Sequence, residues 1–238
     1  MSPGASANVP VAAFCDTEQE IWGVLVGGSD PLLVLARVAG ARAGELLPAQ
    51  AMLDPDAAVW QVQSAGAALS FSAEPGSSGT LIRCGVTGTC TVGDEQLELA
   101  ARGVRHPGTD GRAASLRLVT AWFAAGHGAA LIAHRPPNSS GQDRDAISVD
   151  VFGEAEHVQV FDPRLSTTYG PGTWPQRMGF ELWLGETEDG DHYPRRVAGE
   201  RVGSVVESAT GLGVTACAMK CQSRGDDGLG VYLLVSAS

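Results

Sequence analysis

Apolar and polar residues alternate along two consecutive runs of this chain, residues 85–92 and 97–106. A period of two is typical of half-buried β-strands. The dipeptide Gly93-Asp94 lies between the runs and suits a tight hairpin, because glycine accepts the positive φ that such turns require. A second pair of runs, 116–123 and 129–134, is joined by a turn near 126–128. The stretch 85–135 therefore predicts two antiparallel hairpins.

Similar short runs recur along most of the chain, about fourteen or fifteen in all, with turn clusters such as 74–79 between them. Many short strands with frequent turns favour a β-sandwich or barrel. Segment 40–56 differs, because its helix-tolerant residues and Pro48 fit either a short helical turn or a loop. We predict an all-β, antiparallel protein with few helices.

The second hairpin is apolar on both faces. Leu118 and Trp122 lie on one side of its first strand, and Val119 and Phe123 lie on the other. A strand with one solvated face should carry polar residues at every second position. Both faces are therefore covered. Either another sheet or helix packs on the outer face of the hairpin, or one face lines an apolar cavity, or both faces belong to a filled core.

The length of 238 residues allows one large β domain or two closely packed halves. Residues 1–13 are rich in small residues and proline and are expected to form a flexible tail. Residues 14–238 then form the β domain. If it consists of two halves, the polar loop near 135–145 is their expected boundary.

The formal net charge is −11, with 27 acidic against 16 basic side chains. This balance argues against nucleic acid as a partner, since phosphate binding needs clustered lysine and arginine. No segment has the ~18 uninterrupted apolar residues of a membrane span, and residues 1–14 lack the features of a signal peptide. We expect a cytoplasmic protein without stable membrane insertion.

The chain has five cysteines, an odd number that cannot all pair within one chain. Closely spaced pairs of Cys or His, as in a metal site, do not recur along the chain. Buried free thiols are therefore expected. We predict that function needs neither a metal ion nor an organic cofactor.

A polar elbow, residues 105–112, joins the two hairpins and holds the densest set of ionisable groups beside an apolar wall. Its members Arg105, His106, Asp110 and Arg112 either form a charge-assisted cluster at the mouth of a cavity or are solvated charges on a surface turn.

Other candidates lie on the strands themselves. His134 ends an apolar strand, and Glu181 is either a desolvated acid or a surface charge, depending on which face is interior. Trp122, Phe123 and Trp183 offer large π faces as walls for a polyene, although each also suits plain core.

The runs 86–92, 95–99 and 101–106 resemble the lipocalin-like superfamily of carotenoid 1,2-hydratases, tocopherol-cyclase-like proteins and several natural-product cyclases. In that family a glycine-containing strand precedes an elbow of the form Gly-X-Gly-X-Arg-Asp-His-Ser-Trp-Gly, followed by an aromatic strand. Gly103, Arg105 and His106 match the elbow, and Trp122-Phe123 takes the place of the aromatic strand. Here Pro107-Gly108-Thr109 replaces Ser-Trp-Gly, and Asp110 is the nearest substitute for the missing acid.

The resemblance implies a lipocalin-like barrel, or two packed half-barrels, enclosing an apolar cavity for a polyene, isoprenoid or polyketide. It implies ring closure, isomerisation or hydration without a cofactor. The catalytic candidates are then Arg105, His106, Asp110 and Glu181, and the substrate-binding candidates are Arg112, Trp122, Phe123, His134 and Trp183.

The leading hypothesis is thus a cofactor-independent cyclase or isomerase of secondary metabolism. The alternative is a non-catalytic carrier of a lipophilic small molecule, and a purely structural scaffold is a third reading. A homodimer is compatible with each of them.

Overall fold

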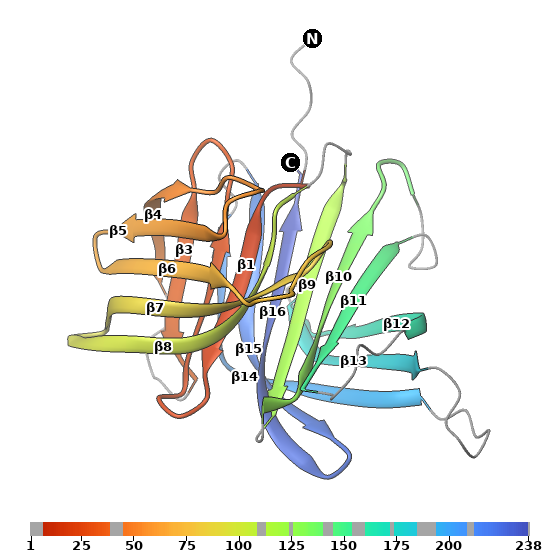
Figure 1. Ribbon diagram of the computed structural model, residues 1–238. Coiled ribbons are helices and arrows are strands. Elements are labelled where there is room, and N and C mark those ends of the chain that lie inside the picture. Colours follow the sequence, from red (N-terminus) through yellow and green to blue (C-terminus); the bar gives the residue numbers. More distant parts are fainter. Residues whose placement is uncertain are drawn as a thin grey trace.

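The computed structural model describes residues 7–38, 45–108, 113–123, 126–139, 145–153, 160–171, 174–184, 194–208 and 212–237. Within these residues the regular structure consists of β-strands (Figure 1). The strands are β1 (Val11–Asp16), β2 (Ile21–Val26), β3 (Leu32–Arg37), β4 (Glu45–Met52), β5 (Val59–Ser64), β6 (Ala67–Ala73), β7 (Ile82–Val92), β8 (Glu95–His106), β9 (Ser115–Phe123), β10 (Gly128–Arg135), β11 (Ala146–Phe152), β12 (Val160–Tyr169), β13 (Pro175–Leu184), β14 (Pro194–Ser208), β15 (Gly213–Ser223) and β16 (Asp226–Ser236).

The strands form two antiparallel sheets that pack side by side (Figure 1). Strands β1 to β8 close into a barrel in which β1 pairs with β8. Strands β9 to β16 form the second sheet, in the order β11-β10-β9-β16-β15-β14-β13-β12. Its two edge strands, β11 and β12, also contact each other, so the second barrel is nearly closed. The all-β, antiparallel, barrel-type fold expected from the sequence is confirmed.

Both predicted hairpins are present. Strands β7 and β8 pair in register from Ile82 opposite Arg105 to Val92 opposite Glu95, and Gly93 in the turn has a φ of 66°. Strands β9 and β10 pair from Ser115 opposite Arg135 to Trp122 opposite Gly128. Local alternation and a suitable turn therefore set the register of the first hairpin.

The strands that are apolar on both faces lie where the barrels meet. Alternate residues of β1 and β9 point into their own barrel and into a shared apolar layer, because successive side chains of a strand face opposite ways. We call this the inter-barrel layer. Its first-barrel members include Val11, Ala13, Cys15, Trp22, Val24, Val26, Val34, Ala36 and Val104, and its second-barrel members include Leu116, Leu118, Trp122, Ala130, Ile132, Phe152, Val214, Ala216, Ala218, Val231, Leu233 and Val235.

Each barrel also has its own core. The first is filled by aromatic and aliphatic side chains such as Phe14 and Phe71, whose rings meet edge to face at 5.6 Å. Gly23 makes room there, because a Cβ at this position would lie 2.3 Å from the Phe14 ring. The second core includes Val119, Phe180 and Met219. In the described part of the chain, each barrel therefore has an apolar core of packed side chains.

Three expectations need correction. Segment 45–52 is strand β4 rather than a helical turn or loop, because pairing with β3 and β5 overrides its local preferences. The change from one barrel to the other falls between His106 and Ser115, earlier than the boundary considered near 135–145. Strand β1 begins at Val11, within the segment expected to be a tail, because β2 and β8 pair with it.

All five cysteines are buried and free, as expected. Cys217 and Cys221 lie on the same face of β15, within the second core. Among the described residues, no helix is long and apolar enough to cross a membrane.

Candidate functional site

The first two residues of the elbow are buried. Arg105 is 2 % exposed and His106 is 0 % exposed. They are consecutive residues at the end of β8, so their side chains point to opposite faces of the sheet. Arg105 reaches into the first barrel and His106 toward the second. The other two elbow candidates, Asp110 and Arg112, lie outside the described residues.

Arg105 is a cation in the first barrel. Its guanidinium lies 4.8 Å from the centre of the Trp60 ring, and Nη2 donates a 2.6 Å hydrogen bond to the Ala57 carbonyl. Burial lowers the pKa of Arg105, while the nearby Cys84 acts in the opposite direction. Within the described part of the chain, Nε and Nη1 have no hydrogen-bond partner. The Trp60 ring and the Ala57 carbonyl thus provide the described interactions that stabilise this buried charge.

His106 meets His134, another sequence candidate, across the junction of the barrels. The ring centres are 5.0 Å apart and the rings are inclined by 71°. His106 stands opposite Val11 in the β1–β8 ladder, and His134 stands opposite Leu116 in the β9–β10 ladder. The pair therefore lies at the edge of the inter-barrel layer, with one imidazole contributed by each barrel.

A hydrogen bond fixes the tautomer of His106. Its Nδ1 lies 2.7 Å from the Thr80 carbonyl oxygen, which can only accept, so Nδ1 carries the proton and Nε2 of the neutral ring has a free lone pair. Nε2 has no partner among the described residues. Burial lowers the pKa of His106, and burial together with the neighbouring His106 lowers the pKa of His134 to about 4. Both rings are therefore neutral at pH 7.

These shifts predict a pH-dependent stability. Because the two imidazoles bind protons less readily in the folded state, the unfolded chain binds more protons between about pH 6.5 and pH 4. The stabilisation is therefore complete above pH 6.5 and falls as the pH drops toward 4. We expect urea unfolding of His134→Gln to depend less on pH over this range than unfolding of the wild type. Equal pH dependence in the two proteins would show that His134 stays as solvated as in the unfolded chain.

Trp122 and Phe123 point to opposite faces of β9. Trp122 lies in the inter-barrel layer against Phe152, with ring centres 4.3 Å apart, and Phe123 lies in the second barrel, stacked on His127 at 5.3 Å. Both contribute to a groove of about 360 Å³ between the barrels that also includes Cys15, Asp16 and Arg102. Another pocket, of about 310 Å³, includes Phe123, His127 and Arg195.

The remaining candidates lie elsewhere. Glu181 is on the outer face of the second barrel, where its carboxylate accepts a 2.9 Å hydrogen bond from Arg196 Nε. Trp183 lies on the same outer face, two residues further along β13. The structure thus brings together His106 and His134. Arg105, the groove residues Trp122 and Phe123, and the outer-face residues Glu181 and Trp183 lie at three other places.

Sequence reasoning missed a polar cluster inside the second barrel, formed around Arg117, Asp145 and Tyr232. One signal for it was available, because Arg117 interrupts an otherwise apolar strand between Leu116 and Leu118. A charged residue there needs a buried partner. No group of three or more His, Cys, Asp or Glu side chains suited to a metal ion occurs among the described residues.

No protein-family model matches the chain, and no curated protein matches it at a significant level. Solved structures do match this chain, over more than nine-tenths of their own length. The structure of CghA has a TM-score of 0.57 at 10 % identity and covers 100 % of this chain and 94 % of that chain. Kievitone hydratase from Nectria haematococca has a TM-score of 0.58 at 7 % identity and covers 100 % of this chain and 91 % of its own.

A third structure, of a protein from Nitrosomonas europaea, has a TM-score of 0.51 at 12 % identity, with 99 % of this chain and 95 % of that chain covered. At such low identities the similarity concerns the fold. The chain therefore has the lipocalin-like double-barrel fold of CghA and kievitone hydratase.

Proposed function

We propose that this protein is a cofactor-independent cyclase or isomerase that acts on a lipophilic natural-product intermediate. The observation that carries the proposal is the His106–His134 pair at the edge of the inter-barrel layer. Two neutral imidazoles beside an apolar layer form an acid–base pair next to a surface that favours an apolar substrate.

The chemistry follows from the tautomer of His106. Its free Nε2 lone pair takes a proton from an acidic C–H or O–H of the substrate, and the same proton then returns to another atom of the substrate. The product is an isomer, and no external oxidant or reductant is consumed. A polyene held in a folded shape would also close a ring faster, because little conformational freedom remains to be lost.

The comparisons support the fold on which this proposal rests. One of the structures with this architecture is named a hydratase, and hydration is one of the reactions that the sequence resemblance implies. The identity of the substrate and the type of reaction in this chain are part of the proposal.

The test replaces each histidine separately. His106→Gln and His134→Gln should lower turnover of an enolisable polyene or polyketide about 10²- to 10⁴-fold, the usual contribution of a positioned acid–base group, with little change in KM. His127→Gln is the matched control, since His127 stacks on Phe123 at the other end of the β9–β10 hairpin. The assay follows product by mass spectrometry and proton transfer by deuterium uptake from D₂O. Folded His106→Gln and His134→Gln proteins with unchanged turnover would overturn the proposal.

One observation favours the alternative, a carrier without catalysis. Trp122, which contributes to the inter-barrel groove, and Leu116, which stands beside His134, are six residues apart on β9, or about 20 Å along the strand. A ligand held only in that groove would not reach the histidines. Recovery of the bound ligand unchanged, without deuterium uptake, would favour the carrier.

A further inference from the structure

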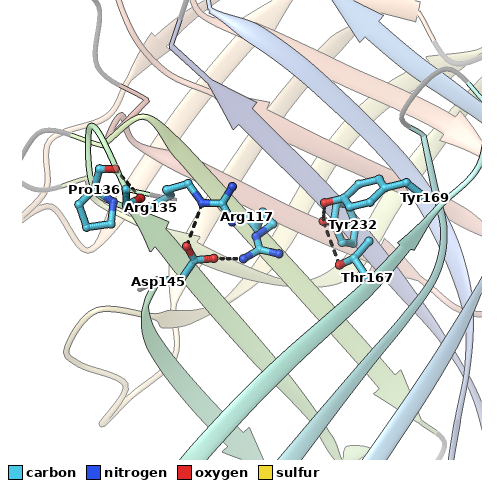
Figure 2. A network of polar contacts seen from close by, with 8 residues as sticks. Arg117, Arg135, Pro136, Asp145, Thr167, Tyr169 and Tyr232 are labelled. Atoms are coloured by element: carbon cyan, nitrogen blue, oxygen red, sulfur yellow. Dashed lines mark hydrogen bonds and ion pairs between the residues drawn. The ribbon is translucent and has the colours of Figure 1, made fainter. Parts of the chain in front are cut away.

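The second barrel encloses an ion cluster that the proposed acid–base pair does not use (Figure 2). Arg117, on β9, contacts the Asp145 carboxylate through Nη2, and Arg135, on β10, lies 3.1 Å from the same carboxylate through Nε. The side chains of Arg117 and Asp145 are 5 % and 1 % exposed. One buried carboxylate is thus shared by two guanidinium groups.

Among the described residues, one of the two guanidinium charges at this carboxylate has no counterion in the cluster. Arg117 and Arg135 together carry two positive charges, against one negative charge on Asp145. Nη1 of Arg117 is buried and has no partner in the described part of the chain. A buried guanidinium normally has its donors occupied, because leaving a charged donor unpaired in the interior is costly. Nη1 is therefore placed to bind an anionic oxygen.

Tyr232 provides a second donor nearby. Its hydroxyl lies 3.3 Å from Thr167 Oγ1 and 3.2 Å from the Tyr169 hydroxyl (Figure 2). Burial raises the pKa of Tyr232, and the positive charge of Arg117 is near enough to oppose that effect in part. The phenol consequently keeps its proton at neutral pH and can donate it in a hydrogen bond.

Aromatic surface continues from this cluster to the outside. Tyr169, which contacts Tyr232, is 40 % exposed, and Trp174 in the β12–β13 turn is 37 % exposed. The guanidinium of Arg201 lies 5.8 Å from the centre of the Trp174 ring. Two partly exposed aromatic rings, one of which contacts Tyr232, offer an apolar group a place next to an anionic one.

We propose that this end of the second barrel binds the carboxylate of an apolar monocarboxylic acid, which accepts hydrogen bonds from Arg117 and Tyr232 while its apolar chain lies against Tyr169 and Trp174. A monoanion matches the single excess charge of the cluster. Dianionic phosphate would bring more negative charge than the cluster can neutralise, into a chain whose net charge is already −11. The site is independent of the proposed acid–base pair, because the neighbours His134 and Arg135 point to opposite faces of β10.

The test uses the full chain and titrates decanoate, decanol and acetate by isothermal calorimetry. Decanoate should bind at one site per chain. Decanol lacks the carboxylate and acetate lacks the apolar chain, so each should bind at least tenfold more weakly. Arg117→Gln should weaken decanoate binding about 10- to 100-fold, as expected for the loss of a hydrogen bond to a charged group. Tyr232→Phe removes a single oxygen atom and should weaken binding about tenfold, so it tests the site even if Arg117→Gln fails to fold.

Two controls complete the design. Arg196→Gln removes an arginine from the outer face of the same barrel, where it pairs with Glu181, and should leave decanoate affinity unchanged. His106→Gln should also leave it unchanged, so that failure of this site and failure of the proposed acid–base chemistry are distinguishable. Equal affinity for decanoate and decanol, or wild-type affinity in folded Tyr232→Phe, would overturn the proposal and assign the cluster a purely structural role.

Discussion

Replacing Trp122 by alanine is expected to lower the free energy of unfolding by about 3–5 kcal/mol, the usual cost of truncating a large buried aromatic side chain. Trp122 is 3 % exposed and packs against Phe152 in the inter-barrel layer. The cavity that its loss creates would border both barrels, so surrounding strands of two different sheets would have to move to fill it. Urea denaturation at pH 7.5 measures the change.

Phe161 offers the matched control, because it is an aromatic residue on β12 that is 64 % exposed. Phe161→Ala should change the free energy of unfolding by no more than about 0.5 kcal/mol, as for most surface substitutions. If Trp122→Ala proves as mild as Phe161→Ala, the ring does not hold the barrels together. Its role as a wall for ligand would then become the stronger interpretation.

The fold could be read from the sequence where the signal is local. Strands β7 and β8 alternate in polarity and are joined by Gly93-Asp94, so their pairing needs no information from elsewhere in the chain. Strand β4 is the opposite case. Its residues tolerate a helix and include Pro48, and only the neighbours β3 and β5 make it a strand. Propensity gave the wrong structure there because non-local pairing outweighs it.

The strands that are apolar on both faces show a second limit. Strand β9 shows no alternation of apolar and polar residues, and this correctly indicates that both of its faces are buried. The pattern cannot say what provides the cover, since a second barrel, a helix and a ligand cavity all demand the same apolar residues. In the structure, the face of Leu118 and Trp122 packs against the first barrel, and the face of Val119 and Phe123 lines the interior of the second.

Only part of the candidate site could be predicted from the sequence. His106 and His134 were both singled out, yet their contact depends on how two sheets pack and not on their separation along the chain. Arg105 was grouped with His106, although neighbouring residues of a strand cannot face the same side. Arg117 is an informative exception to an apolar pattern, because a charge among leucines indicates a buried polar partner.

Removing the carboxylate of Asp145 should be the second large effect. Asp145→Ala is expected to lower the free energy of unfolding by about 3–5 kcal/mol, because it leaves the buried guanidinium of Arg117 without its counterion. The contrast is Asp162→Ala, which removes the partner of Arg164 on the outside of the second barrel, where both side chains are more than half exposed. An exposed pair of this kind contributes only about 0–1 kcal/mol.

A second substitution separates the charge from the packing. In the double variant Arg117→Met/Asp145→Ala no unpaired buried charge remains at this position, so it should be more stable than Asp145→Ala alone, although it has lost more interactions. Denaturation of both variants and of the Arg117→Met protein completes the cycle. A double variant no more stable than Asp145→Ala would mean that Arg117 finds compensation elsewhere in the barrel. Its guanidinium would then have no excess charge to offer a bound carboxylate.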